Sequence, residues 1–250
     1  YASKVNTLIG TKGVGLTSGY LYPGATYPYG MVQFTPSYFS KRSGFVINQL
    51  SGGGCEHMGN FPTFPVKGKL KMSPDNILNY RINISEEKGH AGYYEAMVQE
   101  DIKAKLTVTE RTGMASYEYP ADQQYGTVII GGGISATPIE QAAIVITAPN
   151  KCEGYAEGGN FCGLRTPYKV YFVAEFDTDA LESGTWKRNE LKPNTTFAEG
   201  EYSGVYFTFD VNKKKNIQYK IGVSYVSVEN ARENLKAENT GWDFLQIQNQ

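Results

Sequence analysis

The sequence has no excess of charge of either sign and no long apolar run. Its 24 basic and 25 acidic residues give a net charge of −1, whereas a nucleic-acid groove or a polybasic membrane-binding face needs a local excess of Lys and Arg. No window approaches the roughly 18 consecutive apolar residues of a membrane-spanning helix. The sequence also begins, at Tyr1, without a basic and apolar leader, which is either absent or already removed. We therefore expect no nucleic-acid partner and no membrane span.

Cysteine and histidine are scarce. The three cysteines, Cys55, Cys152 and Cys162, are too few, and odd in number, for a disulfide-stapled fold. Cys152 and Cys162 can pair across a loop, but buried or free thiols are the simpler expectation. The two histidines, His57 and His90, have neither the i, i+4 spacing nor the Cys-x-x-Cys partner of a zinc site. We expect no metal site within this chain.

Local signatures of catalysis are also absent. There is no Gly-x-Ser-x-Gly elbow for acyl transfer. The glycine run at 131–133 lacks the spaced third glycine and the following helix of a dinucleotide site. The adjacent carboxylates Glu86 and Glu87 lie in a charged segment, where a solvated surface is the ordinary explanation.

Glycine and aromatic residues are abundant, with 28 Gly, 19 Tyr and 12 Phe. Aromatic and β-branched residues suit a pleated, half-buried surface, and glycines suit the corners between strands. Apolar and polar residues alternate with period two at 102–109, as in a strand with one buried face. About eleven strands follow, at 31–35, 66–71, 78–84, 92–99, 102–109, 114–119, 126–130, 139–146, 169–176, 205–209 and 217–228.

So many strands do not fit one flat sheet, and the sequence predicts an all-β fold, a large antiparallel β-sandwich over residues 1–228. One short helix is expected at 229–238, where Ala231 and Leu235 recur at i, i+4, and Gly241 ends it. Beyond that stop, Trp242 and Phe244 either fold back on the sandwich or form a docking segment or linker toward another domain.

A glycine-rich loop is the most informative stretch. It contains Ser51, Gly52, Gly53, Gly54, Cys55, Glu56 and His57. Without side chains in the way, its backbone can approach a small polar ligand closely and donate N–H groups to it. The alternative is a tight structural corner in which Cys55 is buried and His57 caps a carbonyl.

Four tyrosines, Tyr20, Tyr22, Tyr27 and Tyr29, lie on a turn rich in Pro and Gly. Such rings can stack on the C–H faces of sugars, but core packing is the ordinary explanation.

Several blocks share one order along nearly all of the 250 residues. They are 6–11 (NTLIGT), 22–33 (YPGATYPYGMVQ), 50–55 (LSGGGC), 92–94 (GYY), 106–113 (LTVTERTG), 171–176 (YFVAEF), 222–231 (GVSYVSVENA) and 241–244 (GWDF). In sequence and spacing this set resembles the N-terminal domain of family 92 glycoside hydrolases, the bacterial exo-acting α-mannosidases.

The resemblance implies the first part of a two-part enzyme. A helical linker, residues 229–250, would lead to a C-terminal (α/α)6 catalytic barrel that holds the general acid, the general base and the calcium ligands. No catalytic residue is therefore assigned to this chain, and the fragment alone is expected to be inactive. The implied activity is calcium-dependent, inverting exo-hydrolysis of α-mannoside glycans, in the bacterial periplasm, at the cell surface or secreted. The glycine-rich loop would face the substrate pocket.

One departure from the family pattern, one open choice of ion pair and one alternative function accompany the resemblance. Asn48-Gln49 replaces a His-containing pair expected just before the loop, which weakens assignment to the α-1,2-specific branch. Glu110 and Arg111 form either a pocket ion pair or a rim salt bridge. The alternative function is a stand-alone carbohydrate-binding β-sandwich, which the tyrosine-rich turns and the lack of catalytic carboxylates favour.

Overall fold

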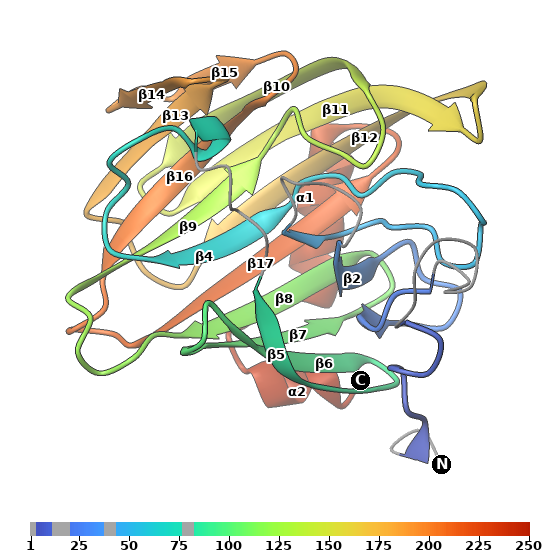
Figure 1. Cartoon of the computed structure of the whole chain (residues 1–250), viewed down its shortest axis with the longest axis horizontal. Helices are drawn as coiled ribbons and strands as arrows, with labels where there is room; N and C mark the ends of the chain where they lie inside the picture. The colour runs from blue at the N-terminus through green and yellow to red at the C-terminus, as the bar shows by residue number, and fades with distance from the viewer. Residues whose placement is uncertain (1–3, 12–20, 38–43, 77–82) are drawn as a thin grey trace.

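Two antiparallel sheets packed face to face form the body of the protein in a computed structural model (Figure 1). The structure describes residues 4–11, 21–37, 44–76 and 83–250. Within them lie seventeen strands, two α-helices and a short 3-10 turn, η3 (Pro74–Asn76). All pairings between the named strands are antiparallel.

The first sheet has eight strands. In spatial order they are β1 (Ala25–Thr26), β2 (Gln33–Pro36), β3 (Phe45–Val46), β4 (Thr63–Lys67), β9 (Tyr125–Gly131), β16 (Ser203–Asp210), β13 (Glu182–Lys187) and β14 (Glu190–Pro193).

The second sheet has nine strands. In spatial order they are β15 (Phe197–Glu199), β10 (Ile139–Ala148), β11 (Lys151–Phe161), β12 (Leu164–Phe176), β17 (Asn216–Ser224), β8 (Thr112–Glu118), β7 (Ile102–Val108), β6 (Tyr93–Val98) and β5 (Ile84–His90).

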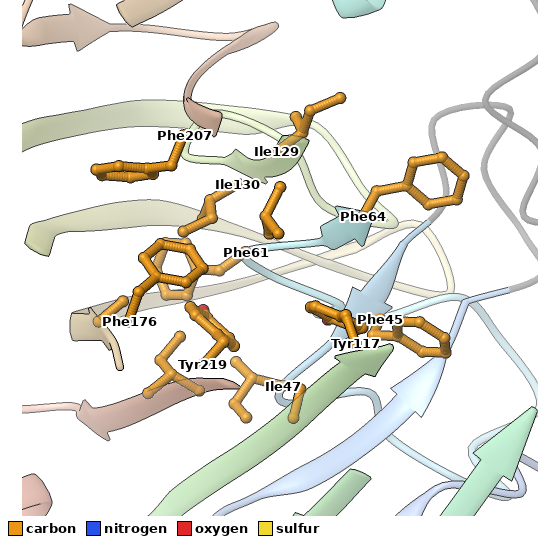
Figure 2. Close-up of a cluster of buried hydrophobic side chains, with 14 of the residues drawn as sticks. Phe45, Ile47, Phe61, Phe64, Tyr117, Ile129, Ile130, Phe176, Phe207 and Tyr219 are labelled. Carbon is orange, nitrogen blue, oxygen red and sulfur yellow. The ribbon is translucent and has the colours of Figure 1, made fainter. Parts of the chain in front are cut away.

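The core lies between the sheets and is rich in aromatic rings (Figure 2). Phe176 of β12 is fully buried, and its ring centroid lies 5.0 Å from those of Phe207 and Phe209 and 5.3 Å from that of Tyr219. Tilted aromatic pairs at such distances add to the free energy gained by burying their large apolar area. The alternation predicted at 102–109 is confirmed over the first part of β7, where Ile102, Ala104 and Leu106 are buried while the lysines between them are not. It fails beyond Leu106, because Thr107 and Thr109 are buried as well.

The predicted two-sheet sandwich is confirmed, but the expected number of strands was too low. The largest omission is β11, whose inward positions hold Cys152, Gly154, Ala156 and Gly158. Small residues of low strand propensity give no aromatic or β-branched signal. They are nonetheless required there, since a Cβ on Gly154 would lie 2.1 Å from the carbonyl oxygen of Ala143. The strand expected at 78–84 lies outside the described residues, except for the last two positions.

The predicted helix is α1 (Val228–Glu238), which begins at Ser227, whose side chain accepts a hydrogen bond from the backbone N–H of Asn230. Ala231 and Leu235 of α1 pack on Val173, so both faces of β12 are covered. Neither α1 nor the shorter α2 is long and apolar enough to span a bilayer, and the described residues contain no other α-helix.

Both aromatic residues after α1 fold back on the nine-stranded sheet. The Lys220 ammonium of β17 lies 4.4 Å from the ring centroid of Trp242, a cation–π contact. Phe244, which begins α2 (Phe244–Gln248), meets Tyr93 of β6 edge-on at 6.3 Å. These contacts agree with the first of the two alternatives for Trp242 and Phe244.

We predict that Phe176→Ala lowers the free energy of unfolding by about 3–5 kcal/mol, because it removes a fully buried ring and leaves a cavity among three others. Phe197→Ala is the matched control: its side chain is 54% exposed, and the loss should be less than about 1 kcal/mol. Urea unfolding followed by tryptophan fluorescence measures both. Equal losses in the two variants would contradict this account of the core.

Candidate functional site

The glycine-rich loop, residues 51–57, lies in the segment between β3 and β4 and faces the tip of the β11–β12 hairpin, at the right of Figure 1. An amide pair closes the base of this segment. The Asn60 N–H donates to Asn48 Oδ1 at 2.7 Å, and Asn48 Nδ2 donates to Asn60 Oδ1 at 3.0 Å. Both residues are buried, so the two hydrogen bonds are well shielded from water.

Two further polar contacts hold the two sides of the loop. Gln49 Nε2 donates to the carbonyl oxygen of His57 at 2.8 Å, across the loop. The Ser51 hydroxyl and the Gln33 side-chain amide exchange hydrogen bonds of 2.8 and 3.1 Å. The Asn48-Gln49 pair thus forms part of the support of the loop.

A disulfide between Cys55 and Cys162, 107 positions apart, joins the loop to the hairpin tip. The expectation that Cys162 pairs with Cys152 or stays a thiol was wrong. Cys152 is fully buried on the core face of β11, where burial raises the pKa of its thiol. Cys162 follows the last residue of β11, at an exposed turn. It can therefore reach the loop, whereas Cys152 points into the sandwich.

His57 lies on the inner side of the loop and is only 8% exposed. Its Nδ1 atom is 3.2 Å from the carbonyl oxygen of Asn160 in β11. Its ring meets Phe161 and Tyr168 edge-on, with centroids 5.2 and 5.8 Å away. The structural alternative proposed for His57, contact with a carbonyl, is therefore observed, and this side chain supports the loop from behind.

The other side of the loop presents backbone to solvent. Ser51, Gly52 and Gly54 are exposed, and the two glycines have φ of +73° and +74°, which residues with a side chain rarely adopt. A Cβ on Gly54 would meet no atom of the described residues within 4 Å. Glu56 is half-buried, and desolvation raises the pKa of its carboxyl group. The open face can thus offer backbone N–H groups, one hydroxyl and one carboxyl group to a ligand.

A polar cluster supports the loop from beneath. The hydroxyl of Tyr168 donates to Asn60 Oδ1 at 2.9 Å, and burial raises the pKa of Tyr168 to about 12. Asn48 Nδ2 also contacts the Tyr225 hydroxyl at 3.4 Å. Asn60 Nδ2 and Gln49 Oε1 are buried and have no hydrogen-bond partner among the described residues. No local pattern indicates this cluster, because Tyr168 and Tyr225 lie more than 100 positions beyond the loop.

The other candidate residues lie elsewhere. Tyr22 is buried in the core, whereas Tyr27 is 38% exposed and Tyr29 fully exposed; the position of Tyr20 lies outside the described residues. Arg111 forms an ion pair with Glu238 of α1, so neither proposed pairing with Glu110 is correct. Nowhere in the described ranges do three His, Cys, Asp or Glu side chains converge as metal ligands would.

Residues 4–224 match the glycosyl hydrolase family 92 N-terminal domain. Since this match covers most of the chain, the chain belongs to that family. Among curated relatives, an uncharacterized secreted glycosidase of Arthroderma benhamiae is 24% identical over 282 residues, which cover 97% of this chain and 36% of the relative.

Solved structures of the family share the fold. A GH92 family glycosyl hydrolase superimposes with a TM-score of 0.84 at 21% identity, over 100% of this chain and 36% of that one. A GH92 α-mannosidase from Bacteroides thetaiotaomicron gives 0.83 at 24% identity, over 99% and 36%. An inverting GH92 mannosidase of the same organism gives 0.76 at 21% identity, over 98% and 34%. The chain thus spans about a third of the length of its relatives.

We predict that Asn60→Ala lowers the free energy of unfolding by about 2–4 kcal/mol, because it leaves the Asn48 amide and the Tyr168 hydroxyl without their shared acceptor. Asn216→Ala is the control. Asn216 is exposed and accepts a hydrogen bond from Ser116, so we expect a loss below about 1 kcal/mol. Chemical denaturation measures both, and an Asn60 variant as stable as the control would argue against the amide pair as the base of the loop.

Proposed function

We propose that this chain forms one wall of the substrate pocket in an exo-α-mannosidase that acts on mannose-containing glycans. Membership of family 92 and the α-mannosidase named among its structural neighbours support the activity. The chain covers only 36% of that neighbour, which supports a further, C-terminal (α/α)6 domain in the full-length protein. The observation that carries the proposal is the glycine-rich loop, which is held at several points while its backbone faces open space.

In this proposal the loop binds and orients the sugar. Backbone N–H groups of Gly52, Gly53 and Gly54 donate to sugar oxygens, and the Ser51 hydroxyl can donate or accept. Cys55 and His57 hold the loop in place, through the disulfide and through the contact of the His57 ring with the Asn160 carbonyl. Glu56, whose carboxyl pKa is raised by burial, is the one carboxyl group of the loop. A wall of this kind recognises hydroxyl groups without transferring protons.

The chemical step is assigned to the C-terminal domain. Inverting glycosidases use two carboxyl groups, one as general acid and one as general base, roughly 6.5–9.5 Å apart so that a water fits between substrate and base. Glu56 is the only carboxylate in the loop. The described residues also offer no acidic cluster for calcium. We therefore propose calcium and the acid–base pair for the C-terminal domain and derive no step through the metal.

Location outside the cytoplasm is part of the proposal. A disulfide that includes an exposed cysteine forms and persists in oxidising compartments, and the Arthroderma benhamiae relative is described as secreted. Both observations support a secreted, cell-surface or periplasmic enzyme.

A stand-alone carbohydrate-binding module is the alternative, which the exposed Tyr27 and Tyr29 rings favour. Titration of the 250-residue chain with mannose oligosaccharides separates the two. Binding at about micromolar Kd would support the module, whereas a single wall, which leaves most of the sugar in water, should bind too weakly to detect.

We predict that Gly54→Asn in the full-length enzyme raises KM for α-linked mannobioses about tenfold or more, a loss of about 1.4 kcal/mol of binding, with little change in kcat. Asn tolerates the left-handed backbone of Gly54 and adds a side chain to the open face of the loop. Gly68→Asn is the matched control, because Gly68 has φ of +76°, equally open surroundings, and a position at the other end of β4. The same KM in both variants would rule out a pocket role for the loop.

A further inference from the structure

We propose that the Cys55–Cys162 disulfide positions the glycine-rich loop for sugar binding, so that affinity for the substrate depends on oxidation of this bond. The inference rests on the proposed function of the loop. Cys162 is in this sense a positioning residue, because it acts on the ligand through the loop. It lies at the tip of a hairpin of the nine-stranded sheet, whereas β3 and β4, which flank the loop, belong to the eight-stranded sheet.

The middle of the loop has few other restraints. Its hydrogen bonds lie at the two sides, through Gln49, Ser51 and the His57 carbonyl. Between them, within the part of the chain that the structure describes, a Cβ at Gly52 would meet one atom of Leu21, at 3.8 Å, and a Cβ at Gly54 would meet none within 4 Å. Consecutive glycines also have a large backbone freedom to lose. Packing alone therefore does little to select one conformation of Gly52 and Gly54.

The β11–β12 hairpin, to which the disulfide joins the loop, is held at more points. Strands β11 and β12 pair almost continuously from Lys151↔Glu175 to Phe161↔Leu164, and the Gly163 N–H donates to Asn160 Oδ1 at 2.9 Å inside the turn. Arg165 binds the Glu140 carboxylate of β10 through two nitrogens, at 3.2 and 3.0 Å. The disulfide thus fastens a loop with few restraints to a braced hairpin.

The hairpin also provides a surface on which the loop lies. A Cβ on Gly53 would lie 3.2 Å from the ring of Phe161, the residue before Cys162. The backbone of Gly53 therefore packs directly on this ring, and the disulfide holds it there. A preorganised binding surface loses less conformational entropy when the ligand binds, so reduction of the disulfide should weaken the affinity of the loop for the sugar.

Reduction of the bond is chemically accessible. Cys162 is exposed and Cys55 half-buried, so a thiolate in solvent can attack the sulfur–sulfur bond. With dithiothreitol, the dithiol supplies two electrons and two protons, the protein gains two thiols, and the reagent closes to its cyclic disulfide. Cys152 is buried in the core as a thiol, which makes it a matched control for the effect of removing a cysteine.

The test compares the oxidised and the reduced full-length enzyme on α-linked mannobioses. We expect reduction to raise KM about tenfold with kcat within about twofold, because a mobile loop loses binding and leaves the chemistry intact. Cys162→Ser should show the raised KM without reductant and no further response to it. Cys152→Ala should keep the low KM and the response to reductant. Reoxidation should restore the low KM of the wild type and of Cys152→Ala, and should leave Cys162→Ser unchanged.

Three outcomes would overturn the inference. One is a lower Tm after reduction together with an unchanged KM, measured at a temperature well below that Tm. The disulfide would then be only a stabilising bond. Another is unchanged amide hydrogen exchange over residues 50–57 on reduction, a measurement on the wild-type protein that needs no variant to fold. The third is a raised KM for Gly54→Asn with a normal KM for Cys162→Ser, which would remove the inference and leave the proposed function. A normal KM in Gly54→Asn and in Cys162→Ser would overturn the inference and the proposed function together.

Discussion

Burial of aromatic rings between the two sheets is the constraint on which the rest of the structure depends. It also determines where the loop segment ends. Phe61, two residues before β4, is buried with its ring centroid 4.2 Å from that of Phe172 in β12. Its φ is +53°, a conformation that costs free energy in a bulky residue. Packing in the core must offset that cost, and it places the end of the loop segment beside the β11–β12 hairpin.

Once the core has brought the two segments together, contacts of decreasing burial hold the loop. The Asn48–Asn60 pair is nearly inaccessible to water, His57 lies behind the loop, and the disulfide reaches the exposed hairpin tip. Hydrogen bonds in buried positions are strengthened by the low local dielectric. The restraint therefore weakens toward the open face, where glycine is needed for its positive φ and where a covalent bond replaces packing.

The sequence predicted those parts of the fold that local pattern determines. The alternation in β7 and the helix α1 follow from side-chain periodicity, and the glycines identified the loop. The strand β11 has a period of two as well, but with Gly154 and Cys152 at inward positions it lacks the bulky residues by which buried strands are identified. The partner of Cys162 could not be predicted, because Cys55 lies 107 positions away in sequence and comes close only when the two sheets pack together.

The composition of the loop limits the role it can have in a reaction. Backbone N–H groups do not titrate, the disulfide-bonded Cys55 and Cys162 do not titrate either, and His57 is turned toward the carbonyl of Asn160. Glu56 is the one carboxyl group of the loop, and burial favours its neutral form. On the proposed function, orientation and proton transfer are therefore separated between two domains, and the pH dependence of hydrolysis arises from carboxyl groups that this loop does not contain.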